Sequence, residues 1–257
     1  MATSSEVTPQ GAREYGSNGI FGIAVPQANP VVEPEMWSLA PRGVSLVTTR
    51  LQGSRVNSRN RLLEYFGNLE ASLDAFDVAP VDAVGIACTG SSYLLGAAEE
   101  QRQLARHEAI FKYPIVTAAQ AIKETLSALN ARIISLVAPY PAWLVDACRE
   151  YWASAGIELA KVISYGAGPA DTRDVYGFTS GLVETTTKDM DVHGVEAVVL
   201  TGTGVPTLNV IPEIARRTCR PVVSSNLCLM WSLLRLERRA KFSAEPMELL
   251  TTRRDLA

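Results

Sequence analysis

VDAVGIACTG, residues 81–90, is repeated later in the chain as VEAVVLTGTG, residues 195–204. Both copies are apolar runs that end in Thr-Gly, and they differ where Cys88 of the first copy stands opposite Gly202 of the second. A short apolar run that ends in glycine and small polar residues predicts a buried strand followed by a tight loop. The chain therefore contains this strand and loop twice, once with a thiol and once without.

The repeat extends beyond these two segments. Three more pairs of segments follow the same order in both parts of the chain, namely 23–26 with 136–139, 43–48 with 156–161, and 113–117 with 220–224. Matched pairs in one order predict two similar halves. We expect a first half at 19–130 and a second at 131–224, after a disordered tail at 1–18, with the helix and tail at 225–257 packing back on the first half.

Short apolar runs alternate with helical patterns along both halves. Because these runs are continuously apolar, both faces of their sheets are predicted to be covered, which is typical of parallel strands between helices. The predicted fold is α/β, with two pseudo-symmetric, doubly wound, parallel-sheet half-domains of the flavodoxin-like type and the active site in the cleft between them. Strands are expected near 20–25, 44–49, 82–87, 114–117, 133–138, 159–164, 196–201 and 221–224, and helices near 62–76, 93–109, 119–129, 141–155 and 206–218.

Composition and charge exclude several classes of function. With 257 residues and 47% hydrophobic side chains, the chain can bury a full core. The formal net charge of −3 and the scattered basic residues predict no binding to nucleic acid or to an anionic membrane. The four cysteines lack CxxC spacing, and the sequence shows neither a membrane-spanning run nor a secretory leader, so we expect a cytoplasmic protein.

Small polar residues follow the predicted strands of both halves, at 26–29, 88–92, 139–140 and 202–204. Ligands of parallel sheets bind beyond the carboxyl ends of the strands, so these four loops meet in one cleft if the halves face each other. Thr-Gly before a helix offers backbone N–H groups and a hydroxyl to an anion, and each loop is a candidate carboxylate cradle. The alternative for either copy alone is a plain tight turn.

The ordered set of motifs resembles a known family. VPxxN ending at Asn29, ACTGSSYLLG from 87 to 96, VAPY ending at Tyr140, LTGTG from 200 to 204 and PVVSSN from 221 to 226 together resemble the aspartate/glutamate racemase superfamily. The closest branch contains maleate cis-trans isomerase and arylmalonate decarboxylase, and the resemblance covers about 19 to about 236. It implies an enzyme without cofactor or metal that acts on a small carboxylic acid, moving protons or adding and eliminating a thiol at a carbon next to a carboxylate.

The resemblance implies roles for residues of both repeated loops. Cys88 stands in the place of the first-half cysteine, which acts as nucleophile or acid/base in the isomerases, whereas Gly202 stands where the second-half cysteine would be. Arylmalonate decarboxylase shows the opposite pattern, with glycine in the first loop and cysteine in the second. The chain thus resembles neither a two-cysteine racemase nor the usual decarboxylase.

The resemblance also implies a set of substrate-binding residues. Those expected to bind the substrate are Asn29, Thr89, Gly90, Ser91, Tyr140, Gly202, Thr203 and Gly204. Of these, Tyr140 matches a tyrosine whose hydroxyl helps to bind the carboxylate, and Asn29 matches an asparagine that contacts a carboxylate in maleate isomerases. A second binding asparagine has no clear match in 166–173, which argues against a dicarboxylate such as maleate.

The residues around Cys88 suggest chemistry independently of the resemblance. A thiol at a strand end, among backbone donors and near a helix N-terminus, is expected to have its thiolate stabilised, and the thiolate is the reactive form. The alternative is a small buried hydrophobe. Among the other cysteines, Cys228 at the start of the last helix is a weaker candidate for a second acid, Cys148 is expected in the core, and Cys219 is expected to be incidental.

Other polar residues are weaker candidates still. Glu33 and Glu35 are predicted to begin and cap a helix, with a role as catalytic base as the minor alternative. His107 and His193 are predicted to be exposed, and they form no metal or triad constellation with a cysteine. The glycines of 166–168 are a candidate hinge for closure over the substrate.

Three functions remain open. An isomerase or racemase that uses Cys88 ranks first, because a first-loop cysteine is the isomerase pattern. A decarboxylase of a substituted malonate ranks second, because decarboxylation needs only one proton donor. A carboxylate sensor without catalysis ranks third. The tail after Arg239, which includes Phe242 and Met247–Leu250, is expected to pack on a neighbouring subunit of a homo-oligomer.

Overall fold

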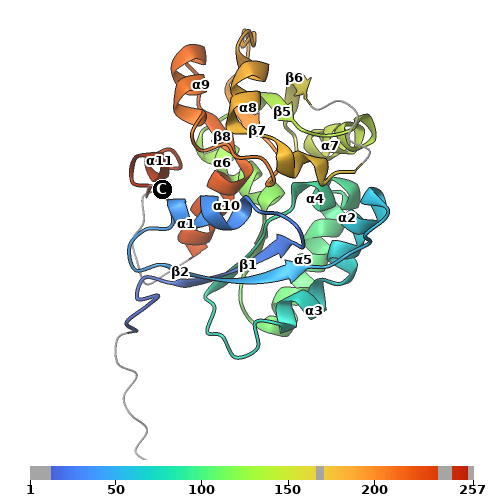
Figure 1. Cartoon of the computed structure of the whole chain (residues 1–257), viewed down its shortest axis with the longest axis vertical. Helices are drawn as coiled ribbons and strands as arrows, with labels where there is room; N and C mark the ends of the chain where they lie inside the picture. Colours follow the sequence, from blue (N-terminus) through green and yellow to red (C-terminus); the bar gives the residue numbers. More distant parts are fainter. Residues whose placement is uncertain (1–12, 166–170, 237–244, 254–257) are drawn as a thin grey trace, which may run out of the picture.

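The computed structural model describes residues 13–165, 171–236 and 245–253, and Figure 1 shows the arrangement of its helices and strands. Asn18, which lies within the predicted tail at 1–18, is held by two hydrogen bonds. It donates its backbone N–H to Gly43 O at 2.9 Å and its side-chain amide to Arg42 O at 2.9 Å. No helix among these described residues combines the length and the apolarity that crossing a membrane would require.

Two four-stranded sheets, each entirely parallel, form the centres of the two halves. The first sheet has the order β2-β1-β3-β4 and the second the order β6-β5-β7-β8. This confirms the predicted fold, and the matching strand orders show the sequence repeat as a structural repeat. The strands are β1 (Ile20–Pro26), β2 (Ser45–Leu51), β3 (Ala83–Ile86), β4 (Ile115–Thr117), β5 (Ile133–Ala138), β6 (Glu158–Ser164), β7 (Ala197–Leu200) and β8 (Val222–Ser224).

Helices cover the sheets and fill the junction between the halves (Figure 1). The first half contains α1 (Val32–Leu39), α2 (Ser58–Gly67), α3 (Leu69–Asp74), α4 (Thr89–Leu95), α5 (Ala97–Phe111) and α6 (Ala118–Ala128). The second contains α7 (Ala142–Ser154), the 3-10 turn η1 (Asp174–Gly177), α8 (Ser180–Thr187) and α9 (Ile211–Thr218). After it follow α10 (Ser225–Leu236) and α11 (Glu248–Thr251).

Three predicted helices have different limits in the structure. The helix expected at 62–76 is two helices that meet at Asn68, and the helix expected at 93–109 is interrupted at Gly96, whose φ of +80° no regular helix accommodates. The helix expected from 206 begins only at Ile211. In each case the hydrophobic period continues across the break, so periodicity alone does not reveal it.

The last long helix, α10, joins the two halves. It contacts α1, α6, β3 and β4 of the first half and β8 of the second, and most of its side chains are buried. The short helix α11 places Leu249 in the core of the same chain, at 4% exposed. The expectation that Met247–Leu250 also packs on a neighbouring subunit stays a prediction, and Phe242 lies outside the described residues. A homo-oligomer stays a prediction.

Surface and core histidines differ. His193 is exposed as predicted, but His107 is 2% exposed and the prediction for it was wrong. Its Nδ1 lies 2.7 Å from Gln103 O, one helical turn earlier, so a backbone carbonyl pairs with this ring nitrogen.

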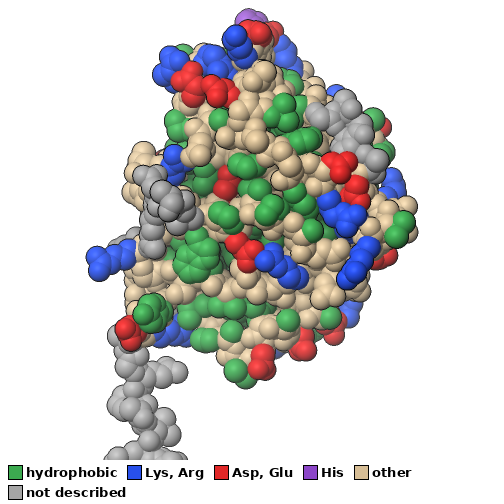
Figure 2. Space-filling model, viewed as in Figure 1, with side chains coloured by type: hydrophobic (Ala, Val, Ile, Leu, Met, Phe, Trp, Pro, Cys, Tyr) green, Lys and Arg blue, Asp and Glu red, His purple; other side chains and the backbone are tan. Residues whose placement is uncertain are grey.

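Charged side chains of both signs lie interspersed over the face of the molecule shown in Figure 2, so the described residues of this face form no large patch of one sign.

Candidate active site

The loops that follow β1, β3, β5 and β7 meet in a small cleft between the halves. The cavity volume accessible to water is about 60 Å³, which suits a small ligand. Seven of the predicted site residues line the cleft together with Cys88, and these are Asn29, Thr89, Gly90, Tyr140, Gly202, Thr203 and Gly204. The other lining residues are Pro26, Arg61, Leu62, Tyr65, Pro139, Leu144, Thr172, Val175 and Tyr176.

Cys88 lies at the end of β3 and caps the N-terminus of α4. Its side chain is 5% exposed, and its Sγ lies 3.1 Å from the hydroxyl of Ser91, which contacts the thiol without lining the cleft itself. Burial raises the pKa of the thiol, although hydrogen bonds from Ser91 and Gly90 and the charge of Arg61 lower it in part. The expected stabilisation of the thiolate is thus present locally, but burial outweighs it.

One cluster of polar side chains lies on the α4 side of the cleft. The hydroxyls of Thr89 and Tyr140 are 2.6 Å apart, and Tyr140 Oη lies 3.1 Å from Thr201 Oγ1, which in turn lies 2.8 Å from the hydroxyl of Tyr93. Burial raises the pKa of Tyr140 well above its ordinary value, so its hydroxyl stays protonated and can donate a hydrogen bond. This chain of hydroxyls offers donors to one carboxylate.

A second polar cluster comes from the opposite loop. Asn29 Nδ2 donates to Thr203 Oγ1 at 3.3 Å, and the Thr203 hydroxyl donates to Ala87 O at 2.8 Å, directly before Cys88. Asn29 Oδ1 accepts from the backbone N–H groups of Val31 and Val32 at 2.8 and 3.2 Å, which fixes the side chain at the start of α1. The thiol therefore shares one cleft with two polar clusters, one at Thr89 and Tyr140 and one at Asn29 and Thr203.

Glu35 supports the second cluster from behind. It lies in the first turn of α1, as predicted, but its carboxylate reaches the other half and accepts from the backbone N–H groups of Thr207 at 2.6 Å and Leu208 at 3.0 Å. Asn226 Nδ2 donates to Glu35 Oε2 at 2.7 Å and to Thr203 O at 3.2 Å. The side chain is 7% exposed, and burial raises its pKa. Glu35 thus holds the loop that carries Thr203.

Removing the Glu35 carboxylate is expected to destabilise the protein. The Glu35→Ala variant leaves two buried amides and the Asn226 side chain without their acceptor, at about 1–3 kcal/mol for each buried group left unpaired. We expect a loss of about 3 kcal/mol or more in the free energy of unfolding, measured by urea titration. The Glu35→Gln variant keeps one oxygen for both amides and serves as the control, with a smaller loss. Equal losses for the two variants would contradict this assignment.

Gly202, opposite Cys88, has a backbone that only glycine adopts readily. Its φ is +99°, and a Cβ built on it would lie 2.8 Å from Pro139 Cγ and 3.5 Å from the hydroxyl of Tyr140. A cysteine at this position would require Pro139 to move. The absence of a thiol from the second loop therefore has a backbone basis.

The remaining predicted candidates lie elsewhere. Cys228 is fully buried in α10, where its thiol contacts Thr125, and it does not line the cleft. Cys148 is buried as predicted, and Cys219 is exposed. The candidate hinge at 166–168 lies outside the described residues. Within the part of the chain that the structure describes, no group of three or more His, Cys, Asp or Glu side chains could hold a metal ion.

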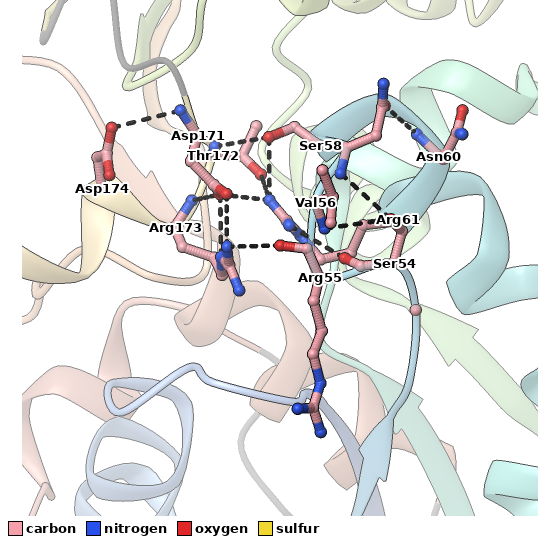
Figure 3. A network of polar contacts seen from close by, with 12 residues as sticks. Ser54, Arg55, Val56, Ser58, Asn60, Arg61, Asp171, Thr172, Arg173 and Asp174 are labelled. Atoms are coloured by element: carbon pink, nitrogen blue, oxygen red, sulfur yellow. Dashed lines mark hydrogen bonds and ion pairs between the residues drawn. The ribbon is translucent and has the colours of Figure 1, made fainter.

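The side of the cleft that α2 and η1 provide was not predicted from the sequence. Arg61 and Tyr65 lie one turn apart on α2, and Thr172 and Tyr176 come from the segment around η1. Arg61 forms an ion pair with Asp171, in the network shown in Figure 3. An arginine within a polar helical segment is typical of a solvated surface, so the sequence carries no signal for its burial.

Comparisons with known proteins agree with this site. The profile of the family described as arylmalonate decarboxylase matches residues 21–249, which includes part of the tail that was expected to lie beyond the resemblance. The maleate isomerase of Pseudomonas putida is 25% identical over 229 residues, covering 84% of this chain and 90% of the relative. That of Geobacillus stearothermophilus is 23% identical over 228 residues, covering 84% and 90%.

Solved structures share the fold. A maleate isomerase from Pseudomonas putida, as a cysteine-to-alanine variant with maleate, has a TM-score of 0.75 at 23% identity, covering 84% of this chain and 90% of its own. A Nocardia farcinica maleate isomerase, as a cysteine-to-serine mutant with a covalently bound succinylcysteine intermediate, has a TM-score of 0.74 at 24% identity, covering 85% and 92%.

A mutant of arylmalonate decarboxylase is similar as well. It combines a glycine-to-cysteine with a cysteine-to-serine exchange, and its liganded form has a TM-score of 0.75 at 19% identity, covering 87% of this chain and 94% of its own. The family profile spans most of the chain, and the relatives are enzymes of two types. This chain therefore belongs to the arylmalonate decarboxylase family, in the branch of the aspartate/glutamate racemase superfamily that also contains the maleate isomerases, and is an isomerase or a decarboxylase.

Proposed function

We propose that the protein is a cofactor-independent isomerase of the cis-trans type, which acts next to a carboxylate of a small organic acid with Cys88 as its nucleophile. The observation that carries this proposal is that one cleft holds the thiol together with two polar clusters, one at Thr89 and Tyr140 and one at Asn29 and Thr203. Donors at separate places in one cleft suit a substrate that is held beside the reacting carbon.

The chemistry needs only one thiol. The Cys88 thiolate adds to the alkene carbon, and the electron pair of the double bond moves onto the adjacent carboxylate as an enediolate. The hydroxyls of Thr89 and Tyr140 stabilise this charge by hydrogen bonding. The carbon–carbon bond is now single and rotates, the electron pair returns, and the thiolate leaves with the alkene reformed. No proton is added or lost over the cycle, so a second thiol at Gly202 is not required.

The covalent step has support from a relative. The Nocardia maleate isomerase mutant holds a covalently bound succinylcysteine, so a cysteine of that protein forms a bond to a carbon of the acid. The succinyl group is saturated, so its neighbouring carbon has also taken up a proton, a step that the cycle proposed for this chain omits. In this chain Cys88 is the one thiol among the described residues that line the cleft. We assign the same bond to its Sγ.

A decarboxylase of a substituted malonate is the second candidate. Burial raises the pKa of Cys88, which favours a protonated thiol that can act as an acid, and part of the cleft wall is apolar, formed by Leu62, Leu144 and Val175. In this reaction carbon dioxide leaves, its bonding pair stays on the remaining carboxylate as an enediolate, and the Cys88 thiol protonates the carbon. Solvent then reprotonates the thiolate.

The dependence of activity on pH is expected to separate the two candidates. A nucleophilic thiolate becomes more abundant as pH rises towards the raised pKa of Cys88, so kcat/KM of an isomerase increases about tenfold per pH unit below that pKa. A proton-donating thiol stays almost fully protonated over the same range, so kcat/KM of a decarboxylase is flat below that pKa and falls only as pH passes it. Stopped assays from pH 6 to 10 measure this slope.

The Ser91→Ala variant removes a hydrogen bond that lowers the pKa of the Cys88 thiol. It is expected to move the pH profile of kcat/KM to higher pH.

Proton NMR in deuterated water tests the proposal directly. The protein and its Cys88→Ser variant are incubated with maleate, with a substituted malonate and with a chiral α-substituted acid. A cis-to-trans product formed only with the intact thiol supports the isomerase, and loss of a carboxylate supports the decarboxylase. No turnover of any acid, together with equal binding by both proteins, would favour the carboxylate sensor instead.

A further inference from the structure

Arg61 is the single charged side chain among the described residues that line the cleft, and the chemistry proposed for Cys88 gives it no role. It lies in the first turn of α2 and is 1% exposed. A buried guanidinium costs several kcal/mol unless anions and hydrogen-bond acceptors surround it. The partners of Arg61 therefore determine what else this side of the cleft can bind.

The contacts of Arg61 leave part of its hydrogen-bonding capacity open (Figure 3). Nη2 donates to Ser58 Oγ at 3.0 Å and Thr172 Oγ1 at 3.0 Å and forms an ion pair with Asp171. Nη1 donates to Ser54 O at 3.1 Å, a neutral acceptor. Because Nη1 carries two hydrogens and makes this one hydrogen bond among the described residues, it retains a donor for a ligand.

Asp171 does not depend on Arg61 for its charge balance. Arg173 holds the same carboxylate with Nε to Oδ1 at 3.1 Å, Nη2 to Oδ2 at 2.7 Å and its backbone N–H to Oδ1 at 2.8 Å. Although burial raises it, the hydrogen bonds of Arg173 and the charge of Arg61 lower the pKa of Asp171 to about 2. Two guanidinium groups thus share one carboxylate. One positive charge remains in excess at the cleft wall.

Two other charged residues contact this network through hydrogen bonds. Arg55, whose backbone oxygen accepts from Arg173 Nη2 at 2.9 Å, and Asp174, whose carboxylate accepts from the Asp171 backbone N–H at 3.4 Å, are both exposed. They have opposite signs and cancel. Arg61, Arg173 and Asp171 together therefore carry one net positive charge, and Arg61 is the buried cation among them.

We propose that Arg61 is a specificity-determining residue that binds a second carboxylate of the substrate, an inference that rests on the proposed function of the same cleft. The first carboxylate lies at Thr89 and Tyr140, next to the reacting carbon. The second lies on the α2 side, where Arg61 Nη1 and the Thr172 hydroxyl donate to it. The sequence argued against a diacid because 166–173 offers no second binding asparagine. Arg61 supplies a hydrogen-bond donor from another element, α2, and adds a positive charge.

The charges exchange without leaving either group unpaired. When a substrate carboxylate contacts Arg61, Asp171 keeps its three hydrogen bonds from Arg173. A hydrogen bond to a charged group contributes about 1.5–3 kcal/mol, so a diacid is expected to bind about tenfold or more tightly than the same acid with one neutral end.

Calorimetric binding to the full-length Cys88→Ser protein tests this inference without turnover. The probes are maleate and its half-amide, maleamate, which have nearly the same size and differ by one charge. We expect maleate to bind at least about tenfold more tightly. Arg61→Gln is expected to bring this ratio close to one, and Arg61→Lys, which keeps the charge but loses the planar fork, is expected to give an intermediate ratio.

Arg216→Gln is the matched control, because it removes a guanidinium group and its ion pair with Glu213 from a residue that does not line the cleft. It is expected to change the ratio of the maleate and maleamate affinities by no more than about threefold. The loss of one hydrogen bond to a charged group would change this ratio more. Thermal melts show whether each variant is folded, and Arg61→Lys decides the question if Arg61→Gln does not fold. An unchanged ratio in the folded Arg61 variants, or no binding of maleate, would overturn the inference.

The same data separate this inference from the proposed function. In one outcome the parent protein turns over no acid, while the Cys88→Ser protein prefers maleate in a way that depends on Arg61. This outcome would remove the isomerase proposal and keep the role of Arg61. Turnover by the parent together with a preference that ignores Arg61 would do the reverse.

Discussion

Replacing Cys88 with serine is expected to lower kcat/KM by at least about a thousandfold while leaving the fold intact, since loss of a nucleophile commonly costs three to six orders of magnitude. The oxygen of serine is nearly isosteric with sulfur but is far less reactive as a nucleophile and far less acidic. The other thiols cannot replace it, because Cys148 and Cys228 lie in the core and Cys219 is exposed. Turnover is measured with the acid found by NMR, and folding by circular dichroism.

Cys219→Ser provides the matched control. The exposed Cys219 thiol lies at the C-terminus of α9 and does not line the cleft, so its removal is expected to leave kcat/KM within a factor of about two, as is usual for surface substitutions. Turnover by Cys88→Ser at a tenth or more of the parent rate would show that the thiol is not the reacting group. In that case both catalytic proposals fail together.

Much of the fold follows from the sequence because the repeat and the strands are local signals. Each strand is a short, continuously apolar run with a loop of small residues at its carboxyl end, and the parallel arrangement follows from burial on both faces. Helix limits were less accurate. The interruption at Gly96 depends on how α4 and α5 pack, and the amphipathic period runs through it without a break.

The site residues that follow strand ends could be predicted for a related reason. Parallel strands bring their carboxyl ends to one edge, so Asn29, Cys88, Tyr140 and Thr203 were expected to meet there, and the structure places them in one cleft. Their roles in binding and chemistry stay proposals. The rule says nothing of helices that approach the edge from the side, and α2 is such a helix.

Contacts between residues distant in the chain account for what the sequence did not reveal. Arg61 is buried because it meets Asp171, 110 residues later, and Glu35 reaches amides 172 and 173 residues away. No local pattern encodes such partners. The pKa of Cys88 has a similar explanation, since its hydrogen-bond donors are local and visible in Cys-Thr-Gly-Ser, whereas the burial that outweighs them is a property of the assembled cleft.

Introducing the second thiol by Gly202→Cys is expected to destabilise the protein and to lower activity rather than to create a two-cysteine enzyme. A φ of +99° costs an ordinary residue about 1–2 kcal/mol, and the Cβ contact of 2.8 Å with Pro139 Cγ adds an overpacking cost of about 1–3 kcal/mol. Relief of this contact moves Pro139 and with it Tyr140. A displacement of about 1 Å at a binding group commonly costs about a hundredfold in rate.

Two other glycines separate the backbone cost from the packing cost. Gly96 has a φ of +80° with nothing within 4 Å of the position that a Cβ would take, so Gly96→Ala measures the conformational cost alone, and Gly67, with neither constraint, gives the baseline. We expect the loss of unfolding free energy to increase from Gly67→Ala to Gly96→Ala to Gly202→Ala, with the cysteine at 202 at least as costly as the alanine. If Gly202→Cys were as stable as the parent and exchanged the α-proton of a chiral acid, the backbone would not be what keeps the second thiol out of this cleft.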